Sequence, residues 1–246
     1  MLIEHLYIHV PFCKSKCNYC DFYSITDFST QQEWLNTIIK HFEYYLSNYE
    51  IKKFKTIYIG GGSPSALDIP ILKKLIQYFE KYIGDDTEFS IELNPSDLHN
   101  DYFEILLDLP ITRISLGIES FDDTVRNTVN RRGSSESITA IIRKLKQYSK
   151  YALSVDLMYG LPLQTKEIIY TDVQKALELN PDHISYYELF LEEASFTAKQ
   201  VKNGLVSLPS IDENEHAWEI IQETISASGY ERYEISNWAL RSKYCK

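Results

Sequence analysis

The regular alternation of short apolar segments with longer amphipathic segments is the feature that most constrains the fold. Six short segments carry the apolar and β-branched residues typical of strands, and each gap between them has room for a helix. Parallel strands need crossover connections of this kind. The pattern therefore predicts an α/β fold, a parallel sheet covered by helices, with strands at Leu6–Val10, Thr56–Ile59, Phe89–Leu93, Arg113–Ile118, Leu153–Leu157 and His183–Tyr187.

The segments between the strands show helical spacing and local signals for helix ends. Thr30-x-x-Glu33 and Asp212-x-x-Glu215 predict helix starts, and Gly229 predicts the end of the last helix. A seventh strand is expected at Glu231–Ile235. The other expected helices cover 71–79, 101–107, 122–129, a segment ending near 149, and 167–179.

Length and composition indicate an ordinary globular protein. The 246 residues suffice for one large or two small domains, and we expect one core domain over 1–240 with a short tail at 241–246. A net charge of -10 does not favour a nucleic-acid partner. The first ten residues include Glu4, and no run of about eighteen apolar residues occurs, so we expect no signal peptide, no transmembrane segment and a cytoplasmic location.

Three cysteines follow the first expected strand in a C-x3-C-x2-C pattern at Cys13, Cys17 and Cys20. Three thiolates can hold three irons of a [4Fe–4S] cluster and leave the fourth iron open for a small molecule. A zinc site or a disulfide is the alternative. Zinc motifs usually repeat C-x2-C or add paired histidines, and an odd trio without a secretory signal disfavours disulfides. Cys245 is expected to be a free thiol.

Polar residues gather at the expected carboxyl ends of the strands, where parallel α/β folds bind ligands. They are His9, Ser63, Glu92, Glu119 and Asp156. Three consecutive glycines, Gly60–Gly62, follow the second strand and let the backbone approach a ligand closely. Without a nucleotide fingerprint, the same glycines are compatible with a simple tight turn.

The cysteine motif and its flanking sequences resemble a known family. The quoted segments are YIHVPFC, YCDF, GGGSPS, SIELNP, RISLGIESFDD, VDLMYGLPLQT, HISYYEL and YEISNWA, which together extend from Leu6 to about Ala239. They resemble the radical S-adenosylmethionine (SAM) superfamily, and within it the oxygen-independent coproporphyrinogen III oxidases and their relatives, the HemW family of heme chaperones. The resemblance implies a six-stranded partial (β/α) barrel, a [4Fe–4S] cluster and SAM as cofactors.

The resemblance also implies roles for individual residues. Cys13, Cys17 and Cys20 match the cluster ligands, and SAM would bind the open iron through its amino and carboxylate groups. Glu119 stands where the family usually has glutamine, which removes an amide donor. Without the resemblance, each of three residues has a simpler explanation. Arg131 and Arg132 could form a solvated surface pair, and Tyr7 could be a core residue. His9 could be a histidine at a strand end whose hydrogen bonds are satisfied within the protein. The positions that match SAM contacts are Tyr7, Gly61, Gly62, Ser63, Glu92, Arg131 and Asp156. Glu119 is also expected among the cofactor-binding residues, and no catalytic residue is assigned.

Two functions follow from the resemblance, and whether the chain is an enzyme stays open. One is a heme chaperone that binds heme and inserts it into acceptor proteins; the other is an oxidase that decarboxylates coproporphyrinogen III with a 5′-deoxyadenosyl radical. Only six residues precede Tyr7 and Asp21 follows Cys20, where the oxidases have a longer extension and a further cysteine. Both features favour the HemW family. The H-N-x-x-Y-W heme-binding motif of that family does not occur before Lys246, so we expect a fragment or a natural short form with weak heme binding and no decarboxylation.

Overall fold

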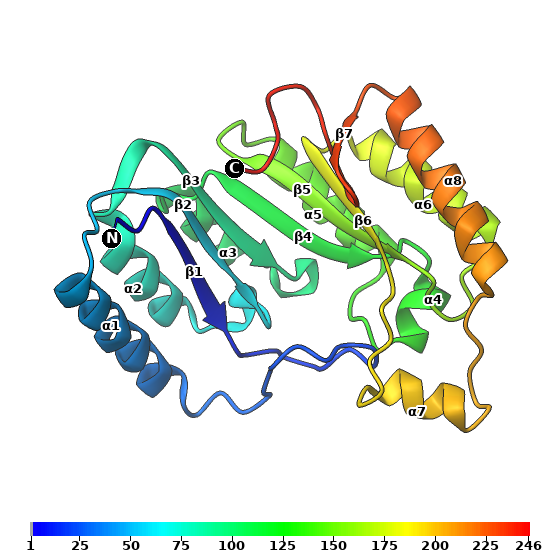
Figure 1. The fold of residues 1–246 in the computed structure, drawn as a ribbon, viewed down its shortest axis with the longest axis horizontal. Helices are drawn as coiled ribbons and strands as arrows, with labels where there is room; N and C mark the ends of the chain where they lie inside the picture. The colour runs from blue at the N-terminus through cyan, green and yellow to red at the C-terminus, as the bar shows by residue number, and fades with distance from the viewer. Residues whose placement is uncertain (1) are drawn as a thin grey trace. The chain divides into compact units, whose positions relative to one another are not determined.

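The computed structural model describes residues 2–246 and divides the chain into two compact units (Figure 1). Unit 1 contains the residues up to Lys14, Tyr23–Ile114 and Lys246. Unit 2 contains Ser15–Phe22 and Ser115–Cys245. Both units combine mostly parallel strands with flanking helices, as the alternation in the sequence predicted.

Unit 1 is built on three parallel strands, β1 (His5–Val10), β2 (Phe54–Gly61) and β3 (Ile83–Leu93), in that order. Its helices are α1 (Gln31–Asn48), α2 (Ile69–Glu80) and α3 (Asn100–Asp108). Strand β3 begins six residues before the expected Phe89, where Phe54 pairs with Ile83. The extension is mostly polar and half-exposed, so it lacks the apolar alternation that marks a strand.

Aromatic side chains from α1, α2 and the strands form much of the core of unit 1. Phe42 packs edge-on against Phe79 and Tyr82, with ring centroids 4.9 and 5.1 Å apart. The predicted capping box at the start of α1 is wrong. Thr30 is the residue before the helix, but its backbone is not extended (ψ 6°) and its side chain makes no capping hydrogen bond.

Unit 2 continues from β4 (Arg113–Glu119), within which the chain passes from one unit to the other. Its strand order is β4, β5 (Ala152–Tyr159), β6 (His183–Glu188), β8 (Asn237–Ala239) and β7 (Glu231–Glu234). Strands β5 and β6 are parallel, whereas β8 is antiparallel to both β6 and β7. The helices are α4 (Asp123–Thr128), α5 (Ser135–Lys146), α6 (Lys166–Leu179), α7 (Phe196–Lys202) and α8 (Ile211–Ala227).

Helix α8 lies beside α6 and completes the core of unit 2 (Figure 1). Ile221 and Ile225 are fully buried, and Trp218 contacts Trp238 of β8 with ring centroids 5.6 Å apart. The N-cap of this helix is Ser210, two residues before the cap predicted at Asp212. Its capping box is Ser210 and Glu213, because the extended backbone of Ser210 lets its hydroxyl accept from Glu213 N and lets Glu213 Oε2 accept from Ser210 N.

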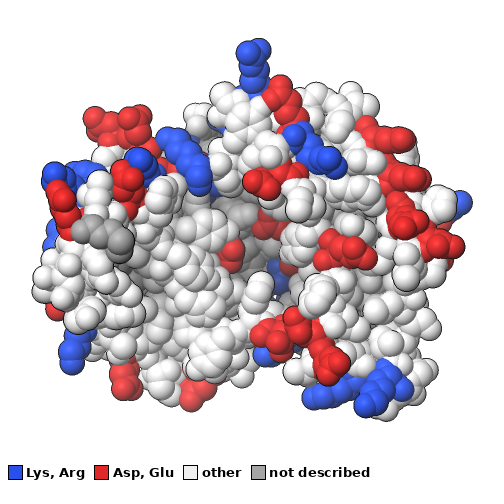
Figure 2. All heavy atoms as spheres, in the orientation of Figure 1, with Lys and Arg blue, Asp and Glu red and all other residues white. Residues whose placement is uncertain are grey.

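Most of the face shown in Figure 2 is uncharged, with separate groups of basic and acidic side chains, and acidic side chains gather along α8. Within residues 2–246, no helix is both long and apolar enough to span a bilayer.

Candidate functional site

In unit 1, the carboxyl end of β3 meets the glycine run Gly60–Gly62, which begins within the last two residues of β2. Glu92 accepts hydrogen bonds from Tyr58 OH at 2.6 Å and from Gly61 N at 3.0 Å. Tyr7 of β1 is 56% exposed, so it is not a core residue, and its hydroxyl bonds His9 Nδ1 at 3.0 Å. Partial burial and the Glu92 carboxylate raise the pKa of Tyr7. In the parallel register Gly61 lies opposite Val10 at the carboxyl end of β1, whereas Tyr7 lies three residues earlier, opposite Tyr58. Their role in binding a cofactor stays a prediction.

The glycine run is required by close packing at each of its three positions. Gly61 also has φ +108°, a conformation that side chains of L-residues rarely adopt. Its amide donates to Glu92, while Gly62 N and Ser63 N donate to Val10 O (2.7 Å) and Phe12 O (2.8 Å). These three N–H groups are thus occupied within the protein. A Cβ would lie 2.7 Å from Glu92 Oε2 at Gly60, 2.4 Å from His9 Nδ1 at Gly61, and 2.8 Å from Val10 O and Phe12 O at Gly62.

The Ser63 hydroxyl belongs to a buried polar cluster next to the cysteine motif. It bonds Ser65 Oγ at 2.8 Å and Asp97 Oδ2 at 3.4 Å, and Ser65 Oγ also donates to Asp97 at 3.0 Å. Lys14, which follows Cys13, pairs with the same carboxylate at 3.3 Å. Ser63 and Ser65 thus bond the same carboxylate, Asp97, that pairs with Lys14, the residue after Cys13. His9 is likewise satisfied, because its Nε2 bonds Tyr23 O at 3.0 Å.

In unit 2, the loop Ser15–Phe22 carries Cys17 and Cys20, and Cys20 N donates to Cys17 O at 3.1 Å. The loop is anchored to the connection between α4 and α5 by both main-chain and side-chain hydrogen bonds. These are Asn18 N to Val129 O (3.0 Å), Asn18 Nδ2 to Thr128 O (3.1 Å), Asn130 Nδ2 to Lys16 O (2.9 Å) and Arg132 Nε to Ser15 Oγ (3.1 Å).

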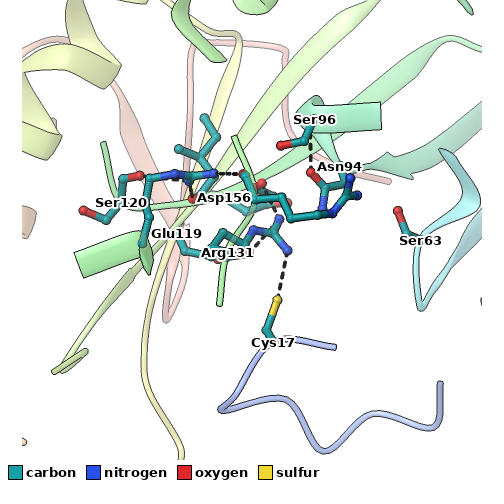
Figure 3. Close-up of polar contacts among 12 residues, drawn as sticks. Cys17, Ser63, Asn94, Ser96, Glu119, Ser120, Arg131 and Asp156 are labelled. Carbon is teal, nitrogen blue, oxygen red and sulfur yellow. Dashed lines mark hydrogen bonds and ion pairs between the residues drawn. The ribbon is translucent and has the colours of Figure 1, made fainter. Parts of the chain in front are cut away.

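Arg131 links this loop to the end of β4 (Figure 3). Its Nη1 donates to Cys17 Sγ at 3.5 Å, and its Nη2 pairs with Glu119 Oε1 at 3.1 Å and donates to Gly117 O. Burial alone would lower the pKa of Arg131, but its interaction with the Glu119 carboxylate is the main cause that raises this pKa well above its usual value. The side chain is largely buried, so Arg131 is not half of a solvated surface pair.

Glu119 lies at the end of β4 in a strained backbone conformation, with φ 69°. Its two oxygens accept from Arg131 and from Tyr187 OH (3.1 Å), so a carboxylate, which only accepts, fits this environment. The structure thus explains why glutamate can replace the family glutamine here: Glu119 neutralises a buried cation.

Two buried charged residues that the sequence analysis missed hold the turn after Glu119. Arg126 of α4 donates to Ser120 O (3.1 Å) and to Ile118 O, and Asp172 of α6 accepts from Ser120 Oγ (2.7 Å) and Phe121 N (2.8 Å). Burial lowers the pKa of Arg126 to about 10 and raises the pKa of Asp172 to about 6. A sequence signal existed for the carboxylate, because it falls within the apolar helical stripe Ile169, Val173, Ala176.

Asp156 of β5 is held by a chain of hydrogen bonds within unit 2. It accepts from Ser115 Oγ at 2.6 Å and from Ser154 Oγ at 3.4 Å. Ser154 Oγ bonds His183 Nδ1, and His183 Nε2 bonds Tyr233 OH, both at 2.8 Å. The predicted site residue is therefore oriented by strands β4, β5, β6 and β7.

The cysteine donor set fits an iron–sulfur cluster chemically. None of the three cysteines forms a disulfide, all three are partly exposed, and Arg131 donates a hydrogen bond to Cys17 Sγ. Cys13 belongs to unit 1, whereas Cys17 and Cys20 belong to unit 2. Among residues 2–246, no three Cys, His, Asp or Glu side chains are grouped at metal-binding spacing, so ligation by these cysteines stays a prediction.

Comparison with known proteins defines the class. The model of the radical SAM superfamily matches residues 7–176, which is more than half of the chain. The chain belongs to the radical SAM superfamily, whose members use a [4Fe–4S] cluster and SAM, and this confirms the predicted cofactors.

Within the superfamily, the chain is similar to the heme chaperone HemW of Lactococcus lactis subsp. lactis (strain IL1403). The two are 34% identical over 237 residues, 95% of this chain and 62% of the relative. HemW of Bacillus subtilis (strain 168) is 32% identical, over 96% of this chain and 64% of the relative. The chain therefore spans less than two thirds of the length of these relatives.

The fold is similar to that of the coproporphyrinogen III oxidase HemN from Escherichia coli. The TM-score is 0.85 at 26% identity, and the match covers 97% of this chain and 56% of that one. This likeness confirms the predicted α/β fold class of a radical SAM protein.

Proposed function

We propose that the chain is the radical SAM core of a HemW-like heme chaperone. In this proposal Cys13, Cys17 and Cys20 bind one [4Fe–4S] cluster, and SAM binds beside it. The main support is the position of Arg131, a buried cation that donates to Cys17 Sγ and pairs with Glu119. Similarity to HemW proteins over at least 95% of the chain is the second support.

The chain's own residues have the hydrogen-bonding capacity that SAM needs. When bound, the cluster supplies an iron with an open position for the amino and carboxylate groups of SAM. Glu92 and Asp156 each retain lone pairs that can accept from an ammonium or a ribose hydroxyl. Arg131 Nε has no hydrogen-bond partner within residues 2–246, so it can still donate to the carboxylate of SAM. Tyr7 of β1 is largely exposed, and its hydroxyl bonds His9 and interacts electrostatically with Glu92.

Anaerobic reconstitution tests the cluster. We expect about four irons and four sulfides per chain and absorption near ~400 nm. Replacing Cys13, Cys17 and Cys20 by serine should abolish uptake. Cys245→Ser is the matched control because Cys245 is exposed, forms no disulfide and lies outside the motif, and it should leave uptake unchanged. A triple serine variant that keeps its full cluster would refute the ligand assignment.

Calorimetry on the reconstituted chain tests the SAM site. Asp156→Ala removes a charge-assisted acceptor, which should weaken SAM binding about ten-fold or more. Asp85→Ala, at an exposed position on β3, is the control and should not change the affinity. Equal affinities for both variants and the wild type would remove Asp156 from the site.

Heme handling separates the chaperone from the oxidase, which the TM-score of 0.85 to HemN supports as the alternative. For the chaperone we expect hemin to bind to the chain and to pass to an apoprotein acceptor, with no decarboxylation of coproporphyrinogen III. The sequence predicts that hemin binding by residues 1–246 is weak, so the titration should extend to high micromolar hemin. Anaerobic SAM-dependent decarboxylation of coproporphyrinogen III would instead favour the oxidase.

A further inference from the structure

Arg126 is one of the largest fully buried side chains of the protein, with 1% of its surface exposed. Its guanidinium donates to four main-chain carbonyls: Ile118, Ser120 (3.1 Å), Arg132 and Gly133 (3.0 Å). Burial lowers its pKa only to about 10, so it is charged at neutral pH. A buried cation needs strong partners, and here peptide carbonyls provide them.

These four carbonyls are not scattered. Ile118 and Ser120 lie on either side of Glu119, which has φ 69°. A strained backbone conformation of this kind persists only where contacts with the surrounding structure stabilise it. Arg132 and Gly133 directly follow Arg131 in the chain. One planar guanidinium therefore joins the two backbone segments that carry the Glu119–Arg131 ion pair. The main chain adds a further bond, because Arg131 N donates to Arg126 O at 2.8 Å.

The same connection between α4 and α5 also anchors the cysteine loop. Asn130 donates to Lys16 O, Arg132 donates to Ser15 Oγ, and Arg131 reaches Cys17 Sγ. A shift of this connection would therefore move the hydrogen bonds that hold Cys17. Figure 3 shows Arg131 and Glu119 with Cys17 at this point.

We infer that Arg126 is a positioning residue for the cofactor site: it fixes the Glu119 turn and the Arg131 connection, and through them SAM affinity and the order of the Ser15–Cys20 loop. It touches neither cofactor. This inference rests on the proposed function for its effect on SAM. Its effect on the loop concerns the protein without cofactors and can be tested independently.

The first test is hydrogen exchange on the chain without cofactors, comparing wild type, Arg126→Ala and Arg126→Lys. Lysine keeps the charge, but its single ammonium cannot fork to two segments. For Arg126→Ala we expect exchange about ten-fold faster or more in 15–20 and 130–133, and no change in α6 and α8. Arg126→Lys should show the same local pattern with smaller amplitude. Arg143→Ala, at an exposed position on α5, is the matched control and should exchange like the wild type.

The second test uses the reconstituted protein and adds a chemical rescue. We expect Arg126→Ala to weaken SAM binding about ten-fold and to shift the electron paramagnetic resonance signal of the reduced cluster. Methylguanidinium at millimolar concentration should refill the vacated space and restore SAM affinity in Arg126→Ala, with no effect on the wild type or on Arg143→Ala.

The outcomes are distinguishable. Wild-type SAM affinity and loop exchange in both Arg126 variants would overturn the inference. Uniformly faster exchange across unit 2, without rescue by methylguanidinium, would overturn it too, because Arg126 would then only stabilise the fold. If the Ala variant does not fold, Arg126→Lys decides by the same criteria. Failure of the wild type to take up a cluster would refute the proposed function, while hydrogen exchange would still decide the role of Arg126.

Discussion

Asp172 should make the stability of this protein fall as the pH rises toward neutrality. The carboxylate is 1% exposed on α6 and accepts from Ser120 Oγ and Phe121 N. Its burial outweighs these hydrogen bonds and raises its pKa from 3.8 to about 6. The native state thus binds the Asp172 proton more tightly than the unfolded state does. The stability from this proton is present below about pH 4 and is lost as the pH rises through about 6.

The size of the effect follows from the two pKa values. Above pH 7 the full loss is about 3 kcal/mol, since each unit of pKa difference corresponds to about 1.4 kcal/mol. Between pH 8 and pH 5 the native state recovers about 1.4 kcal/mol of this amount. Asp172→Asn removes the titration but keeps the hydrogen bonds, because the amide oxygen can accept from Phe121 N and the amide N–H can donate to Ser120 Oγ.

Urea denaturation of the apo chain at pH 5 and pH 8 measures this difference. We expect the free energy of unfolding of the wild type, relative to Asp172→Asn, to rise by about 1.4 kcal/mol on going from pH 8 to pH 5. Asp85→Asn, at an exposed position on β3, should follow the wild type. Parallel pH dependence in wild type and Asp172→Asn would show that burial does not raise this pKa, and the reasoning would fail.

Three further changes should lower the free energy of unfolding measured by urea denaturation. Gly61→Ala places a Cβ 2.4 Å from the His9 ring at φ +108°, so we expect a loss above about 2 kcal/mol, and full stability would contradict the packing described. Glu119→Gln leaves the buried charge of Arg131 without its anion, so we expect the free energy of unfolding to fall by about 1–3 kcal/mol. An unchanged free energy of unfolding would mean that the ion pair contributes nothing to stability. Ile221→Ala opens a cavity at a fully buried position of α8 and should cost about 2–5 kcal/mol; a cost below 1 kcal/mol would mean that the site collapses.

Much of the fold could be predicted from the sequence, because strands and helices that are buried on one face have apolar residues at regular spacing. The six strands and the helices between them follow such patterns, and β7 was expected at the correct place. Helix α7 has seven residues and β8 only three, too few for a period to emerge. The true cap of α8 was missed because Ser210–Glu213 and Asp212–Glu215 are both cap-like. Only the backbone of the folded chain selects between them.

The site was predictable where side chains lie at strand ends, and not where side chains bind the backbone. Glu92 and Asp156 stood out as carboxylates in apolar strands. Arg126 looks like an ordinary helical arginine, because its partners are carbonyls of residues that no sequence pattern marks. The pairing of Glu119 with Arg131 was also invisible, since it depends on a left-handed turn that few non-glycine residues adopt.

The glycine run at the end of β2 also determines which second-site changes could restore a damaged protein. At Gly60 the obstacles are two side chains, the carboxylate of Glu92 and the ring of Tyr58, so a substitution there has conceivable suppressors at positions 58 and 92. At Gly61 the backbone conformation itself excludes a side chain, and no change at His9 removes that strain. At Gly62 the obstacles are the carbonyls of Val10 and Phe12, which every residue possesses. A suppressor screen should therefore rescue the first of these glycines and neither of the other two.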